Sequence, residues 1–210
     1  ITTLKPFRFG IVRGSFHCSN QDLTSLEGAP EWVFGNFNCS RNNLKNLVGG
    51  PSFVGNGYFC HNNELTTLEG FPNQRISGTV NISHNKLTSL KGSPQEVYRD
   101  FICVQNKITS FEGAPRKIYN NFDCSFNEIF LMEGFPERVS GDFDGRYNNF
   151  PLRDMPKIVW GNVLSYEGEL MEKPERRRPK GRDEDPLGNF FKKLSGDDDF
   201  DINDFLSDDE

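Results

Sequence analysis

The stretch FICVQNKITSFEGAP, residues 101–115, returns 21 residues later as FDCSFNEIFLMEGFP, residues 122–136. The same order of residue types runs through most of the chain. Each copy opens on an aromatic or β-branched residue, at Phe16, Phe37, Tyr58, Val80, Phe101, Phe122, Phe143 and Val163. The spacing is 21 residues, with one step of 22 and one of 20. A fixed period of this length indicates a solenoid, in which each turn buries its apolar edge against its neighbours.

Each copy contains the elements of a strand, a turn and an extended return. Apolar and polar residues alternate at its start, which predicts a strand with one buried face. An amide side chain follows at Gln21, Asn42, Asn63, Asn85, Asn106, Asn127 and Asn148. We expect these amides to bond backbone groups that no strand partner satisfies. Gly-x-Pro closes the half-repeat, since glycine permits a positive φ and proline fixes an extended path.

A strand followed by Asn and a second Leu resembles the leucine-rich repeat consensus over about residues 12–165. The resemblance is greatest to the short bacterial kind, although Gly-x-Pro stands where those repeats have a Leu-Pro segment. It implies a bacterial or bacteriophage source. We therefore predict a mainly-β solenoid over residues 1–170, with about seven repeats within 16–163 plus caps. Repeats this short leave no room for a helix, so the expected fold is a curved parallel sheet with an irregular convex side.

The five cysteines, Cys18, Cys39, Cys60, Cys103 and Cys124, occupy one register position, and Ile82 fills it in the intervening repeat. A position that accepts Ile is an apolar core position, which free Cys also suits. The chain offers no C-x-x-C pair for zinc. We expect buried free thiols, no metal or other cofactor, and a reducing, cytoplasmic location (the host cytoplasm for a phage protein or an effector).

The charge distribution argues against a nucleic-acid surface on the repeats. Residues 1–170 hold 16 Lys and Arg against 17 Asp and Glu, and residues 171–210 hold 8 against 13. Phosphate binding requires clustered basic residues, so we predict no nucleic-acid binding by the array. No apolar run approaches the roughly 20 residues needed to span a bilayer, and no membrane association is predicted.

Residues that alternate with the buried ones are predicted to lie on the concave face. Some are apolar where the pattern calls for polar residues, and an acidic area including Asp142 lies next to them. Exposed aromatic residues with polar surroundings are typical of binding hot spots. The alternatives are tolerated surface hydrophobes and an acidic area that only keeps the face soluble. The candidate partner-binding residues are Phe59, His61, His84, Asp100, Ile102, Val104, Asp123, Phe126, Asp144 and Tyr147.

No catalytic constellation is evident in the sequence. His61 and His84 come from adjacent repeats, but the neighbouring columns offer only Ser, Asn and Arg. The serines recur with the repeat, so none is marked as a nucleophile. We predict that the chain is not an enzyme, and we see no small-molecule substrate.

After residue 170 the periodicity ends. Residues 171–186 are predicted to be a charged linker, and residues 187–210 an acidic, disordered tail with short apolar motifs at Leu187, Phe190, Phe191, Phe205 and Leu206. Glu184-x-x-Leu187-x-x-Phe190-Phe191 resembles the peptide that binds sliding clamps, although that family normally begins with Gln.

The favoured hypothesis is a non-enzymatic protein-binding module whose concave face engages a partner, with a tail that carries linear motifs. A second hypothesis is a replication or transcription accessory protein that docks on a clamp or polymerase through Leu187, Phe190 and Phe191. A third is a virion or assembly component in which the array is mainly structural.

Overall fold

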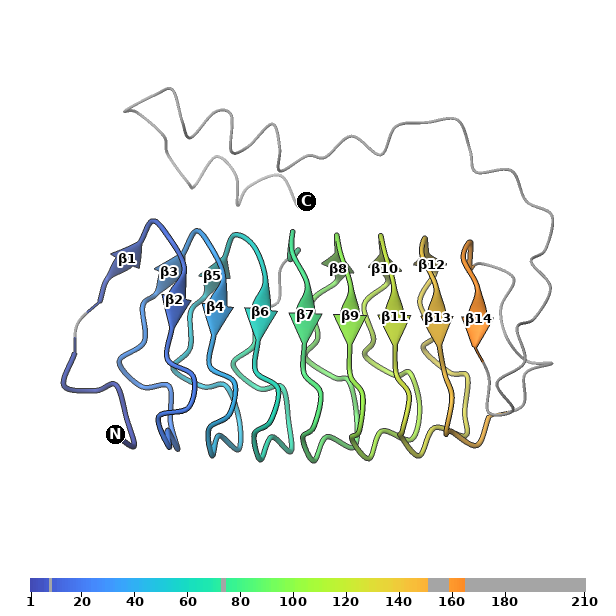
Figure 1. Ribbon diagram of the computed structural model, residues 1–210, viewed down its shortest axis with the longest axis horizontal. Helices are drawn as coiled ribbons and strands as arrows, with labels where there is room; N and C mark the ends of the chain where they lie inside the picture. Colours follow the sequence, from blue (N-terminus) through green and yellow to red (C-terminus); the bar gives the residue numbers. More distant parts are fainter. Residues whose placement is uncertain (8, 73–74, 151–158, 165–210) are drawn as a thin grey trace, which may run out of the picture. The chain divides into compact units, whose positions relative to one another are not determined.

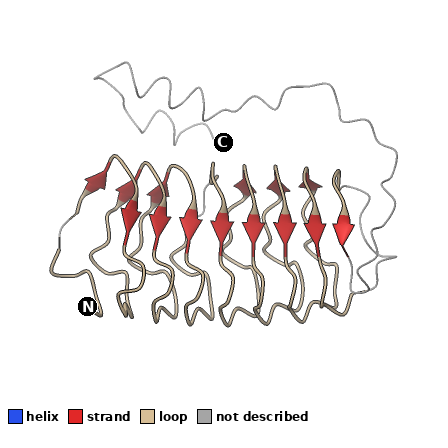
Figure 2. Ribbon diagram, viewed as in Figure 1, coloured by secondary structure: helices blue, strands red, loops and turns tan. Residues whose placement is uncertain are grey.

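The computed structural model describes residues 1–7, 9–72, 75–150 and 159–164. The chain divides into two units, Ile1–Arg176 and Arg177–Glu210, and every described residue belongs to the first. This unit is a parallel β-solenoid of about seven turns with repeats of about 21 residues. None of the described residues lies in a helix (Figure 2).

One side of the solenoid is an eight-stranded parallel sheet (Figure 1). Its order is β14-β13-β11-β9-β7-β6-β4-β2, so neighbours in space are successive turns of the chain. The strands are β2 (Phe16–His17), β4 (Phe37–Asn38), β6 (Tyr58–Phe59), β7 (Val80–Asn81), β9 (Phe101–Ile102), β11 (Phe122–Asp123), β13 (Phe143–Asp144) and β14 (Val163–Leu164). Every strand begins at a residue of the predicted register, and these residues pair with one another from turn to turn. The predicted period and strand positions are confirmed.

The opposite side also carries short strands, which corrects the expectation of an irregular side. One three-stranded sheet contains β1 (Ile11–Val12), β3 (Trp32–Val33) and β5 (Phe53–Val54). The other contains β8 (Glu96–Val97), β10 (Lys117–Ile118) and β12 (Arg138–Val139). Their second residues are buried β-branched side chains in most turns, as at Val33, Val97 and Ile118. The signal was present in the sequence as a second recurring β-branched position, because such residues pack well on a pleated surface.

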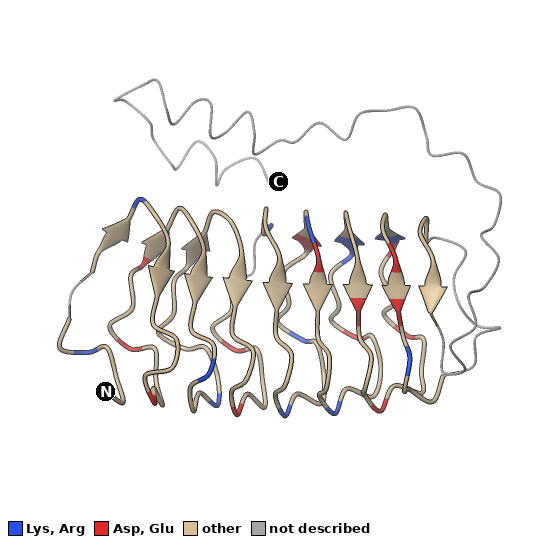
Figure 3. Ribbon diagram, in the orientation of Figure 1, with Lys and Arg blue, Asp and Glu red and all other residues tan. Residues whose placement is uncertain are grey.

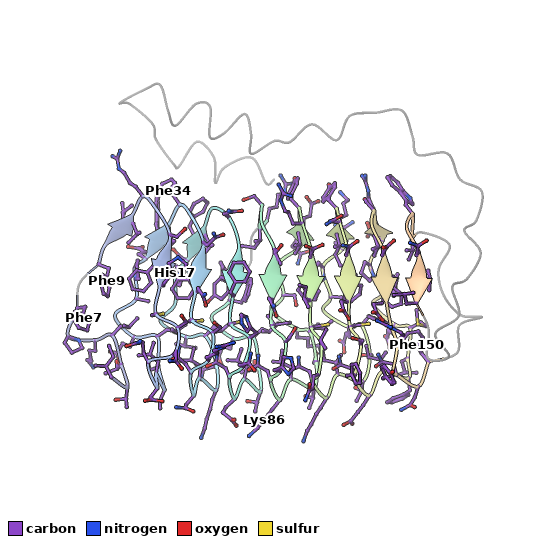
Figure 4. The ribbon with its side chains drawn as sticks, in the orientation of Figure 1. Phe7, Phe9, His17, Phe34, Lys86 and Phe150 are labelled. Atoms are coloured by element: carbon purple, nitrogen blue, oxygen red, sulfur yellow. The ribbon has the colours of Figure 1, made fainter. Side chains whose placement is uncertain are left out.

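The core lies between the two sides. Phe37, Phe101, Phe122 and Phe143 are fully buried, as are the Leu or Ile residues two positions after Asn42, Asn63, Asn85, Asn106 and Asn127. At the N-terminal end, ring contacts link Phe7 to Phe9 and Phe9 to Phe16 (Figure 4). These aromatic residues cover the first turn, which has no preceding turn among the described residues to bury its apolar edge.

All five cysteines are free and buried, at 5% exposure or less. Burial raises the pKa of Cys18 to about 12, and it raises the other four thiol pKa values further above their usual range. We therefore expect no thiol to react with Ellman's reagent in the native protein at pH 8, because the thiols are protonated and the reagent cannot reach them. All five should react in denaturant. A thiol that reacts rapidly without denaturant would contradict a closed core.

The recurring Asn side chains bond backbone groups, as predicted, and they also form a buried ladder between turns. The Oδ1 atom of Asn106 accepts the Leu87 N–H at 3.1 Å. Its Nδ2 atom donates to the carbonyls of Ile82 and Cys103, each at 3.1 Å. The same bonds recur at the other five Asn positions, and the six side chains are at most 9% exposed. Each amide joins the turn before it to its own turn, where strand pairing has ended.

Candidate functional site

Three residues after each of the strands β2, β4, β6, β7, β9, β11 and β13, one exposed residue adopts a left-handed conformation. The seven φ values lie between +53° and +57°. We call this set the corner row: Asn20, Arg41, Asn62, His84, Gln105, Phe126 and Tyr147. Left-handed backbone costs an L-residue roughly 1–2 kcal/mol, and Asn tolerates it best. Asn20 and Asn62 fit the conformation, whereas bulky side chains at the other positions bring no conformational advantage.

Phe126 and Tyr147 are the aromatic members of the corner row. Their rings stack with centroids 4.1 Å apart and planes 20° from parallel. The side chains remain 52% and 50% exposed, respectively, so the pair does not belong to the core. Stacking contributes about 0.5–1.5 kcal/mol beyond burial, which at most offsets the conformational cost. The left-handed conformation recurs in all seven turns and so belongs to the repeat, whereas exposed aromatic side chains at this position are particular to these two turns.

The other apolar candidates are half-buried. Ile102 and Val104 lie on and beside β9, with intermediate exposure. The Phe59 ring lies over Gly57, where an added Cβ would come within 2.7 Å of the ring. Gly57 therefore leaves the space that Phe59 covers. Of the five predicted apolar positions, only Phe126 and Tyr147 are mostly accessible.

The acidic candidates Asp100 and Asp142 form part of a second ladder between turns. Asp100 accepts the N–H of Asn121 at 3.2 Å, and Asp142 accepts the N–H of Asn162 at 2.6 Å. Asn121 makes the same bond to Asp142, at 2.8 Å. These two carboxylates therefore have a structural role in addition to their charge, which sequence analysis missed.

Asp123 and Asp144 face one another across β11 and β13. The Asp123 carboxylate accepts both the N–H and the hydroxyl of Ser125, at 3.0 and 2.7 Å. Arg146 pairs with Asp144 at 2.5 Å. Burial raises the pKa of Asp123, and the adjacent Asp144 carboxylate adds to the effect. The Asp123 and Asp144 carboxylates therefore bond groups in the turns that lead to the aromatic pair.

The two candidate histidines lie near Arg41. His61 is half-buried, and its Nδ1 atom is buried with no hydrogen-bond partner among the described residues. Burial lowers the pKa of His61, and the charges of Arg41 and His84 lower it further. Arg41 and His84 are both exposed, and neither has an acidic partner in the part of the chain that is described. This end of the corner row is therefore positively charged or polar.

Sequence analysis missed a stack on the opposite side. The rings of Tyr98 and Tyr119 lie 4.6 Å apart and nearly parallel. Ser140 occupies the next turn, and the Arg138 guanidinium fills the space between Tyr119 and Trp160, at 4.8 and 4.2 Å. The Arg138 Nε atom also donates to the Ser140 hydroxyl at 2.8 Å. The available signal was the recurrence of aromatic residues in one register, with Tyr119 one repeat after Tyr98 and Trp160 two repeats after Tyr119.

The first residues of the strands on this opposite side change character along the solenoid. Ile11, Trp32 and Phe53 pair across β1, β3 and β5, and Phe34 packs against Phe53 (Figure 4). Further along, charged residues occupy the same register (Figure 3). Glu96 pairs there with both Arg75 and Lys117. These ion pairs are satisfied within the array.

Several predictions concern residues outside those described. They include the linker, the acidic tail and its motif residues Leu187, Phe190, Phe191, Phe205 and Leu206. Within the described ranges, no three His, Cys, Asp or Glu side chains are grouped so as to hold a metal ion. The same ranges contain no helix that is long and apolar enough to cross a membrane.

Among known proteins, no protein-family model matches the chain, and no curated protein matches it closely enough to serve as a relative. The chain's own surface is therefore the basis for a functional proposal, and the corner row is the part that local folding explains least.

Proposed function

We propose that this chain is a non-enzymatic protein-binding module that engages its partner through the corner row. The stacked Phe126–Tyr147 pair carries the proposal. Both rings are about half exposed, at positions where their backbone conformation favours Asn. Exposed aromatic side chains held rigidly by their neighbours are typical of binding hot spots.

The type of repeat and the location belong to the same proposal. A strand, an Asn whose amide bonds the backbone and a second buried Leu recur in the turns of Asn42, Asn63 and Asn85, which supports a short leucine-rich-repeat type. Five free, buried thiols support a reducing compartment such as a bacterial cytoplasm.

Replacing Phe126 and Tyr147 together by Asn distinguishes a role of the pair in binding from a role in folding. Asn is the residue that Asn20 and Asn62 already supply in the corner row. The gain in backbone preference and the loss of stacking nearly cancel, so the free energy of unfolding should change by less than about 1 kcal/mol. Crosslinking capture from the native source, with the full chain as bait, should lose the partner by about tenfold or more.

Phe130→Asn is the matched control, because it removes a comparably exposed aromatic side chain (54%) that lies outside the corner row. It should retain full capture. Equal capture by the double variant would contradict the proposal. Loss of capture together with a large fall in unfolding free energy would show that the pair stabilises the fold.

A further inference from the structure

The corner row has two ends of different chemistry. Arg41 and His84 lie toward the N-terminal end, with the half-buried His61 beside them. Phe126 and Tyr147 form the aromatic end. Asn20, Asn62 and Gln105 complete the row with uncharged amides. A partner that spans the row therefore meets a cationic or polar region first and an aromatic region second.

The corner row is also narrow. On the strand side, Ser40, Ser83 and Ser125 are at most 4% exposed, whereas the corresponding residues of the other turns, Ser19, His61, Val104 and Arg146, are half-exposed. On the other side, the neighbours are the Asn ladder, at most 9% exposed. At Arg41, His84 and Phe126 the exposed row is thus one side chain wide, and in the other turns a half-exposed residue borders it. A ligand that contacts both ends must extend along the solenoid axis.

The repeat sets the length of such a ligand. Adjacent parallel strands lie about 4.8 Å apart, so the four steps from Arg41 to Phe126 cover about 19 Å. An extended chain advances about 3.3 Å per residue, so this distance corresponds to about six residues. The two steps from His84 to Phe126 correspond to about three residues.

We propose that the corner row binds an extended peptide segment that places a carboxylate at Arg41 and His84 and an apolar side chain against Phe126 and Tyr147. This inference rests on the proposed function and specifies the partner's chemistry. The carboxylate complements two exposed basic side chains without acidic partners among the described residues. The apolar side chain covers aromatic surface that the fold leaves in water.

Fluorescence anisotropy of labelled synthetic peptides with the full chain tests this assignment. The probe is a Gly/Ser peptide with a Glu pair and a Leu-Phe pair separated by about five residues. A second peptide replaces the Glu pair by Lys, and a third removes the spacer. The Glu peptide should bind at least about tenfold more tightly than either. Equal binding of the Lys peptide, or tighter binding of a single-stranded oligonucleotide, would overturn the inference.

Variants test whether the peptide occupies the corner row. Arg41→Asn should weaken binding of the Glu peptide about fivefold or more, whereas Arg13→Asn removes the same charge after β1 on the opposite side and should not. Equal effects of the two variants would overturn the inference. The same variants separate this inference from the proposed function. A native partner whose capture depends on Phe126 and Tyr147 but not on Arg41 would support protein binding and exclude the peptide assignment.

Discussion

Replacing Asn106 by Ala is expected to lower the free energy of unfolding by roughly 3 kcal/mol. The substitution leaves the buried Leu87 N–H without its acceptor, which alone costs about 1–3 kcal/mol. The carbonyls of Ile82 and Cys103 lose one of two amide donors each, since Asn85 and Asn127 also bond them. A cavity at an 8% exposed position adds to the loss.

Urea unfolding monitored by circular dichroism measures this change. Gln21→Ala is the control, because Gln21 holds the same register position in the first repeat but is exposed. Within the described ranges, its side-chain amide donates to the Ser19 and Asn20 carbonyls alone, and both lie in its own turn. We expect that control to change stability by no more than about 0.5 kcal/mol. Similar losses for the two variants would mean that the ladder between turns does not determine stability.

The features that could be predicted from the sequence are those whose residue type repeats from turn to turn. Phe101 and Asn106 recur as the same residue type in most turns. The burial of Phe101 followed from the period of the apolar pattern, and the bonding of Asn106 followed from the need to satisfy backbone N–H and C=O groups. The strands of the opposite side were missed. Val97 and Ile118 also recur, but these two-residue strands follow loops and carry little alternation of their own.

The candidate site could be predicted only in part, because its geometry depends on backbone conformation and on small residues. Phe126 and Tyr147 were identified as polar positions occupied by aromatic residues. Their left-handed backbone was not foreseen, although Asn20 and Asn62 in the same register are typical of it. The partial burial of Phe59 depends on Gly57, and the insertion of Arg138 depends on Ser140. A glycine or serine that leaves space for a neighbouring side chain gives no signal of its own in a sequence pattern.

The largest expected effect at a turn is that of Gly70→Ala, which should lower the free energy of unfolding by roughly 3–4 kcal/mol. Gly70 has a φ of +87°, so any Cβ there costs about 1–2 kcal/mol. An added Cβ would also lie 2.3 Å from the Leu47 carbonyl carbon and 2.4 Å from the Val48 nitrogen. Both atoms are backbone of the preceding turn, so relief requires the turns to separate, at about 1–3 kcal/mol.

Gly92→Ala isolates the conformational part of that cost. Its φ of +91° is nearly the same, but its added Cβ would lie 3.3 Å from Leu68, at the one step of 22 residues. We therefore expect a loss of about 1–2 kcal/mol in urea unfolding, about half that of Gly70→Ala. Equal losses would mean that φ alone explains the recurring glycine. A larger loss at Gly70 would show that glycine also sets how closely turns stack, and with it the spacing of the corner row.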